Sequence, residues 1–297
     1  MGLKRLTPRA MPALILSANL PDIDSFVARW AGAQPIAEHR GFTHGVGGLV
    51  TMPLLAAAII LTWEKLRRGK EGPVNLGGLL VCCLLGTLSH PLLDWMNTYG
   101  VRFLEPISNR WFYADTLFIM DPWIWITLIL GLELSWRGER LGRDWTRPAL
   151  WAFGAMLAYI GVNFAISSRA EALASRQVQA TGIAPRLVVA SPPPLLFWQR
   201  RIVWRGDAVG GTGEYDLLQG LNHARLDPRI TPLNLDDPRL AAALRSDAHV
   251  RAFYFWARMP IVTIDHGRAF LGDQRYSGGG VGRSTFLIPL DNGRPSS

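Results

Sequence analysis

Long apolar stretches in the first 170 residues alternate with short polar loops, and this pattern indicates helices that cross a membrane. Four stretches approach the ~20 residues that a bilayer span requires. They occupy residues 45–63, 74–93, 116–132 and 148–166. A shorter apolar run at residues 11–20 precedes them and is too short to span securely, so we expect a half-helix or the remnant of a longer one. The pattern predicts a polytopic helical membrane domain over residues 1–168.

After residue 168 short alternating or aromatic runs replace the long apolar stretches. These runs occupy residues 186–190, 195–204, 249–256, 261–264, 269–271 and 284–290. Glycine and proline clusters at 191–194, 210–213 and 278–280 separate several of them, and such residues supply turns between antiparallel strands. One helix is expected at 238–245, with Asp237 as its N-cap and Pro238 at its first position. We therefore expect a β-rich domain over residues 169–297.

Composition and charge exclude several classes of protein. Hydrophobic residues make up 49% of the chain and charged residues 18%, which excludes a disordered chain, a coiled coil and a disulfide scaffold. The net charge of +8 comes from 28 arginines and 3 lysines without a basic helix or a lysine-rich tail, so we expect no nucleic-acid partner. Cys82 and Cys83 are adjacent within an apolar run, which favours packing over a disulfide or a zinc site.

Loop charges predict the orientation of the spans. Three basic segments share one side of the membrane if the four spans alternate and the run at 11–20 also crosses. They hold Lys4, Arg5, Arg9, Lys65, Arg67, Arg68, Lys70, Arg137, Arg140, Arg143 and Arg147. The opposite loops, 21–43 and 95–115, hold two arginines each. Because positive loops stay in the cytoplasm, we expect the β-rich domain to be extracytoplasmic.

Ionisable residues gather at the predicted outer ends of the spans. They are Asp22, Asp24, His39, His44, His90, Asp94, Asp115 and Asp121. His90 and Asp94 are spaced i and i+4, which puts both on one face of a helix. Imidazoles and carboxylates suit zinc, manganese or iron, and a metal pair can activate water and clamp the oxygens of a phosphoryl group. The set predicts metal-dependent hydrolysis, with Asp115 or Asp121 as a further ligand or general base.

Two features of this set have structural alternatives. Asp121 precedes Pro122 and equally suits the N-cap of the third span. Asp22 and Asp24 suit caps of a helix that starts near Ser25. Their spacing also points them in different directions on a regular helix, so one of them alone can be the ligand.

Burial and charge favour function for two other residues. His90 lies within an apolar run, where an unpaired imidazole is costly. Arg40 suits an anionic substrate group or a lipid phosphate better than a metal.

Two rival functions stay open: a non-enzymatic membrane protein with a structural metal and a partner-binding β domain, and a transporter with an intramembrane relay. Closed coordination of the metal by four protein ligands would favour a structural role, whereas a coordination position open to water would favour an enzyme. A relay requires acids deep within the spans, whereas these acids cluster at the ends.

Several short motifs resemble the YdjM-type bacterial inner-membrane metal-dependent hydrolases. They are Ala18-Asn19-Leu20-Pro21-Asp22-Ile23-Asp24, His39-Arg40-Gly41-Phe42-Thr43-His44, Ser89-His90-Pro91-Leu92-Leu93-Asp94, Asp115 and Asp121-Pro122. The resemblance covers about residues 11–166. It implies an inner-membrane location and ligand roles for Asp22, His39 or His44, His90 and Asp94. Members usually begin with a full helix that bears an early Thr-His motif, which this chain lacks, so either the start lies upstream or one ligand is missing.

A distant similarity of that family to zinc-dependent phospholipase C and P1-type nucleases extends these expectations. It implies one to three divalent metal ions, with zinc as the expected element, and hydrolysis of a phosphoester or phospholipid-like substrate. The expected fold is a membrane helical bundle with a C-terminal extracytoplasmic β-rich domain, and membrane lipids are the expected partners. The C-terminal domain carries no motif that assigns it a role.

Overall fold

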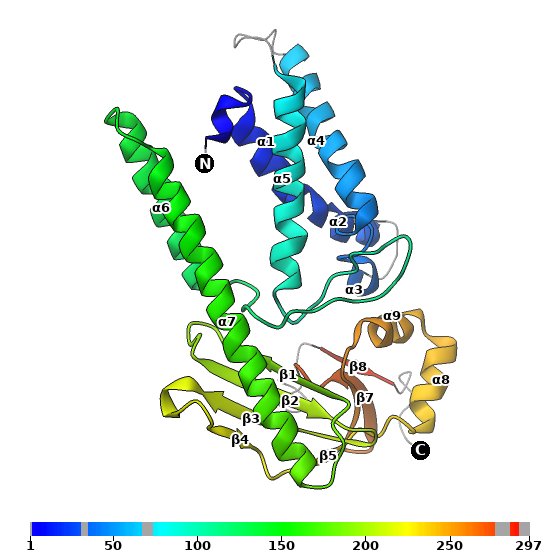
Figure 1. Ribbon diagram of the computed structural model, residues 1–297. Helices are drawn as coiled ribbons and strands as arrows, with labels where there is room; N and C mark the ends of the chain where they lie inside the picture. Colours follow the sequence, from blue (N-terminus) through cyan, green and yellow to red (C-terminus); the bar gives the residue numbers. More distant parts are fainter. Residues whose placement is uncertain (1, 31–34, 67–73, 277–285, 291–297) are drawn as a thin grey trace. The chain divides into compact units, whose positions relative to one another are not determined.

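The chain folds into two compact units, one helical and one that combines antiparallel sheets with helices. The computed structural model describes residues 2–30, 35–66, 74–276 and 286–290 (Figure 1). The first unit comprises Met1–Ala33 and Glu38–Phe164, and the second comprises Gln34–Ala37 and Ala165–Ser297. Part of the predicted basic loop (Arg67, Arg68 and Lys70) and the glycines at 278–280 lie outside the described residues.

Within the described part of the chain, three helices are long and apolar enough to cross a membrane. They are α4 (Val46–Leu66), α5 (Leu76–Trp95) and α7 (Thr146–Ala180). Each overlaps one of the stretches expected to span, and α4 and α5 begin one and two residues later than expected. The third expected span, at 116–132, differs because its helix α6 (Pro122–Arg140) begins six residues later. Glu133, Arg137, Glu139 and Arg140 lie in its last two turns, so the helix exceeds the apolar stretch and is less suited to hydrocarbon.

The run at 11–20 forms a short helix whose end breaks into further turns. A 3₁₀ turn, η1 (Leu3–Arg5), precedes α1 (Ala10–Asn19). A second 3₁₀ turn, η2 (Leu20–Asp22), then leads into α2 (Ile23–Trp30). Pro21 lies in η2 and has no backbone N–H to continue the hydrogen bonds of α1, so the regular helix ends there. The short helix α3 (Pro35–Glu38) follows before α4.

Small residues let α1 pack closely on α5. Gly78, Cys82 and Gly86 are buried at four-residue intervals on α5, facing Ala13 and Ser17 of α1. A Cβ atom at Gly86 would collide with the Ser17 hydroxyl, and one at Gly78 would collide with the Leu6 carbonyl. Such spacing of small residues is typical of helices that approach closely in membranes. The close packing sets the end of α1 beside the last turns of α5.

The second unit is built from two antiparallel sheets. The larger sheet has the order β1 (Leu187–Ser191), β2 (Gln199–Arg205), β3 (Val209–Asp216) and β4 (Ala224–Leu226), with β5 (Thr231–Pro232) also paired to β3. The smaller sheet has the order β6 (Pro260–Asp265), β7 (Arg268–Asp273) and β8 (Leu287–Pro289). Ile166, Ala170 and Ala174 of α7 pack with Ile202 and Tyr215 of the larger sheet in one apolar cluster. The lower part of α7 therefore covers this sheet (Figure 1).

Two predictions for this unit were wrong. Residues 249–256 form a helix, α9 (Ala248–Trp256), because Asp247 caps it and the buried Val250, Phe253 and Trp256 repeat at every third position rather than every second. Gly210, Gly211 and Gly213 lie inside strand β3 instead of a turn. A Cβ atom at Gly211 would collide with the Trp204 ring, so close packing explains its presence. The expected helix at 238–245 is confirmed as α8 (Pro238–Ser246), with Asp237 as its cap.

Candidate metal centre

Three segments remote in the sequence bring six of the predicted residues together at one end of the first unit. Asp22 lies in η2 and Asp24 in the first turn of α2. His39 and His44 lie between α3 and α4. His90 and Asp94 lie one above the other in the last turns of α5, as their spacing predicts.

Asp22, His44, His90 and Asp94 form the first group. One ligand atom from each lies within 4.8 Å of the other three. The Nε2 atom of His90 is 3.1 Å from Oδ1 of Asp22 and 3.4 Å from Oδ2 of Asp94. The Nε2 atom of His44 is 3.3 Å from the same Asp94 oxygen. Two imidazole nitrogens and two carboxylate oxygens therefore face a common point.

Hydrogen bonds assign the Nδ1 atom of both imidazoles as the protonated nitrogen. His90 Nδ1 lies 2.7 Å from the backbone carbonyl of Ala18, which can only accept. The Thr43 hydroxyl donates to Asp24 over 2.7 Å, so it accepts from His44 Nδ1 at 2.9 Å. In the neutral form of each ring, the lone pair on Nε2 then points at the group. Such an outer hydrogen bond is typical of metal-ligating histidine.

Two buried atoms of the first group lack a hydrogen bond to any described residue. They are His44 Nε2 and Asp94 Oδ2, which face each other at 3.3 Å. A buried polar atom without a partner costs about 1–3 kcal/mol, and a cation between these two atoms, a proton or a metal ion, would satisfy both. The oxygen and nitrogen donors of this group fit a divalent metal such as zinc.

The charges within the group shift the protonation of His44 and Asp22. Burial works against a charged imidazole, but the carboxylates of Asp22, Asp24 and Asp94, which lie 3.3–3.6 Å from its nitrogens, outweigh it and raise the pKa of His44 to about 10. Burial likewise opposes the charged form of Asp22, and hydrogen bonds with His44 and His90 outweigh it and hold its pKa well below the usual range. A site that attracts a proton this strongly also attracts a metal cation, which would replace it.

Asp22, Asp24 and His39 form a second group that shares Asp22 with the first. His39 Nδ1 is 2.8 Å from Oδ1 of Asp24, and His39 Nε2 is 4.0 Å from Oδ1 of Asp22. Asp24 also accepts from the Thr43 hydroxyl at 2.7 Å and from the backbone of Arg40 at 3.1 Å. With its oxygens occupied in this way, Asp24 orients the two imidazoles of His39 and His44.

Arg40 lies within the site as a partner of Asp94. Its guanidinium is buried, and it contacts Asp94 Oδ1 at 2.9 Å and donates to Asn97 Oδ1 at 2.9 Å. It also lies over the Tyr99 ring at 4.6 Å. The left-handed backbone of Arg40, with φ of 61°, turns the chain between His39 and Gly41. These contacts hold Asp94 in place, and the predicted contact of Arg40 with an anionic substrate stays a prediction.

Asp115 and Asp121 do not join either group in the described part of the chain. Asp121 caps α6, as one of its two interpretations predicted: Oδ1 accepts from the backbone of Trp123 at 3.0 Å, and Oδ2 accepts from the Tyr159 hydroxyl at 3.0 Å. Asp115 is buried with a left-handed backbone, φ of 52°. Asp121 therefore caps a helix, and a catalytic role for either residue stays a prediction.

Sequence reasoning missed the residues that orient the ligands. Thr43 lies inside the motif at 39–44, and Ala18 contributes through its backbone carbonyl alone. The only sequence signal for Thr43 is its position next to His44. A backbone acceptor such as Ala18 leaves no signal, since any residue type provides a carbonyl.

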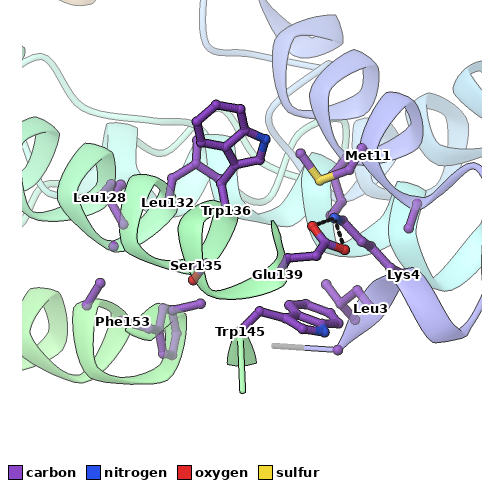
Figure 2. A pocket seen from close by; sticks show the side chains of 16 residues that line it. Leu3, Lys4, Met11, Leu128, Leu132, Ser135, Trp136, Glu139, Trp145 and Phe153 are labelled. Carbon is purple, nitrogen blue, oxygen red and sulfur yellow. Dashed lines mark hydrogen bonds and ion pairs between the residues drawn. The ribbon is translucent and has the colours of Figure 1, made fainter. Parts of the chain in front are cut away.

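A separate apolar cavity of about 350 Å³ lies in the first unit, between α1, α6 and α7. None of its lining residues belongs to either ligand group. Figure 2 shows Leu128, Leu132 and Phe153 along its wall, and the ion pair of Lys4 with Glu139 at its side. The cavity lacks the convergent polar atoms that the ligand groups possess.

The family comparison matches mainly the first unit. The family model for the YdjM inner membrane protein matches residues 2–170, a range that includes every predicted site residue. The chain is similar to the "Uncharacterized protein YfhP" of Bacillus subtilis (strain 168), with 22% identity over 177 residues, 60% of this chain and 52% of that protein. It is also similar to the "Inner membrane protein YbcI" of Escherichia coli (strain K12), with 35% identity over 120 residues, 38% of this chain and 63% of that protein.

The chain thus spans between about half and under two thirds of the length of these curated relatives. No solved structure matches it. The expected family resemblance is confirmed because the matching model covers more than half of the sequence. This chain belongs to the YdjM inner membrane protein family.

Proposed function

We propose that this protein is a membrane-bound, metal-dependent hydrolase that acts on a phosphoester or phospholipid-like substrate at the outer face of the membrane. The observation that carries the proposal is the convergence of His44 Nε2 and Asp94 Oδ2, both buried and unsatisfied by any described residue, with His90 and Asp22. Zinc is the metal that this donor set suits best.

The exposure of Asp22 supports a catalytic rather than a structural metal. Its side chain is 50% exposed, whereas the side chains of His44, His90 and Asp94 are at most 18% exposed. The group therefore has one buried member, His44, two partly buried members and one edge that faces solvent. A structural metal is usually enclosed by four protein ligands, while a catalytic metal keeps a position open to water or substrate.

This chain's own residues would perform the remaining tasks. When bound, a divalent metal lowers the pKa of water and polarises a phosphoryl oxygen. The Ala18 carbonyl holds His90 with Nε2 toward the site, and Thr43 does the same for His44. The Asp24–His39 pair presents His39 Nε2 toward Asp22, where the imidazole can move a proton. The Arg40 guanidinium pairs with the Asp94 carboxylate and partly neutralises its negative charge.

The orientation of the site follows from the loop charges. Lys4, Arg9 and Arg137 lie in segments that the positive-inside rule places in the cytoplasm. The ligand groups lie at the opposite ends of α4 and α5. We therefore propose that the site lies at the outer face and that the second unit, which follows α7, is extracytoplasmic.

Metal analysis together with hydrolysis tests the proposal. Protein purified in detergent should contain at least one zinc per chain by plasma mass spectrometry and should hydrolyse a phosphodiester. His90→Ala and Asp94→Ala should lose both properties, whereas His223→Ala, which removes an exposed histidine of the second unit, should keep them. Bound zinc without turnover on any phosphoester would favour a structural metal, and absence of metal from the wild-type protein would refute the site.

A further inference from the structure

Helix α2 presents an apolar face that no described part of its unit covers. Ile23, Phe26, Val27 and Trp30 are 41%, 76%, 53% and 91% exposed. Their spacing of three, one and three residues places them within an arc of about 100° on the helix. Two aromatic and two branched residues on one side of a two-turn helix form a continuous patch rather than scattered exposure.

The other side of α2 belongs to the candidate metal centre. Asp24 contacts His39 and Thr43, and the Ser25 hydroxyl lies 2.8 Å from His39 Nδ1. Ala28 is buried on the same side. The helix therefore has one face that orients ligands and one face that is open, and the two are separated by its width.

The position of α2 in the unit indicates what covers the open face. The turn η2, which leads directly into α2, contacts α4 and α5 at the ends that carry His44 and His90. Helices α4 and α5 are candidate membrane spans, and Val46 and Val50 in the first turns of α4 are exposed. The turn into α2 thus lies where two candidate spans end, and the open apolar face of α2 suits contact with lipid at that depth. Tryptophan and phenylalanine on such a face are typical of interfacial helices.

We propose that α2 lies in the membrane interface, with Phe26 and Trp30 among the lipid acyl chains. Its ligand-orienting face then borders the same leaflet, so the natural substrate of the candidate metal centre is carried by a membrane lipid. The placement of α2 rests on its own exposed face. The substrate class rests on the proposed function.

Spin labels test the placement without any requirement for activity. Phe26→Cys, Trp30→Cys and Arg29→Cys are labelled one at a time in lipid nanodiscs. Cys82 and Cys83 are buried, so the wild-type protein treated with the same label sets the background. Labels at 26 and 30 should collide more with oxygen than with a water-soluble nickel chelate. The label at 29, which replaces an exposed arginine off the apolar face, should show the reverse. Equal access of the chelate to all three labels would overturn the placement.

Two test compounds, a phospholipid in vesicles and a water-soluble phosphodiester, show whether the substrate is carried by a lipid. The double variant Phe26→Ser/Trp30→Ser should lose about tenfold of its turnover on phospholipid vesicles. It should keep its turnover on the soluble bis(p-nitrophenyl) phosphate. Leu218→Ser/Leu221→Ser removes two exposed leucines of the second unit and should change neither.

Unchanged vesicle turnover, or an equal loss on both substrates, would overturn the lipid-borne substrate. A wild-type protein that hydrolyses neither substrate refutes the proposed function. In that case the spin labels decide the placement of α2 by themselves.

Discussion

His90 Nδ1 donates to the backbone carbonyl of Ala18 over 2.7 Å, across 72 positions of the sequence. This hydrogen bond joins the last turns of α5 to the end of α1, just before the turn that carries Asp22. It fixes the imidazole plane, and it leaves Nε2 directed at Asp22 and Asp94. The packing of α1 against α5 therefore also sets the geometry of the candidate metal ligands.

Removal of the charge on Asp24 should weaken metal binding without abolishing it. Asp24→Asn keeps the size of the side chain but loses the charged acceptor for His39 and His44. Loss of such an orienting carboxylate typically costs about 10- to 100-fold in metal affinity. Competition with a fluorescent zinc chelator measures this change. Asp207→Asn, at an exposed ion pair, is the control, and an unchanged affinity in Asp24→Asn would show that Asp24 does not orient the ligands.

A larger residue at Gly86 should separate α1 from α5. Gly86→Val introduces side-chain atoms where Ser17 and the Leu14 carbonyl already lie, and overpacking of this kind costs about 1–3 kcal/mol. We expect a lower Tm and loss of retained zinc, since His90 moves away from Asp22. Gly154→Val on α7 meets open space and should change neither property. Zinc retained at the wild-type level in Gly86→Val would show that the metal site does not depend on the packing of α1 against α5.

Replacement of Arg40 should make stability more dependent on metal. Arg40→Met leaves the buried Asp94 carboxylate without its cation, and removal of one partner of a buried pair costs about 3–5 kcal/mol. A divalent metal restores positive charge beside Asp94, so added zinc should raise the Tm of the chelated variant more than that of the chelated wild type. Differential scanning fluorimetry measures both shifts, with Arg29→Met as an exposed control. A smaller zinc shift in Arg40→Met would contradict this account.

The second unit should depend on a buried ion pair between Asp273 and Arg275. The two side chains are 0% and 2% exposed and meet at 2.8 Å, and the Asp273 carboxylate also accepts from the backbone of Met259 at 3.1 Å. Asp273→Asn should therefore destabilise the protein by about 3–5 kcal/mol. Asp207→Asn breaks the exposed pair with Arg186 and should cost at most about 1 kcal/mol. Chemical denaturation followed by circular dichroism compares the two variants. Equal unfolding midpoints would show that the buried pair does not stabilise the second unit more than the exposed pair.

The predicted orientation can be tested by cysteine labelling in whole cells. Leu218→Cys lies at an exposed site of the second unit, and Arg143→Cys lies at an exposed site between α6 and α7. A membrane-impermeant maleimide should label position 218 in intact cells and position 143 only after lysis, because positive loops stay in the cytoplasm. The opposite pattern would place the candidate metal centre at the inner face.

Sequence patterns predicted those elements whose stability is local. The helices α4, α5 and α7 follow from long apolar runs, and α8 follows from Asp237 and Pro238 at its start. The pairing of His90 with Asp94 follows from helical spacing alone. The helix α9 was missed because an aromatic run of eight residues suits both a strand and a helix until its buried side is known.

Tertiary structure decided which of the ionisable residues meet. All eight were placed at one membrane face by topology, yet only six converge. The close approach of α1 and α5 at Gly86 brings Asp22 to His90, while the cap of α6 occupies Asp121. The sequence could determine the ends of helices and the chemistry of each side chain. The contacts between segments remote in the chain depend on packing of small residues and on backbone carbonyls such as that of Ala18, which the pattern of apolar and polar positions does not encode.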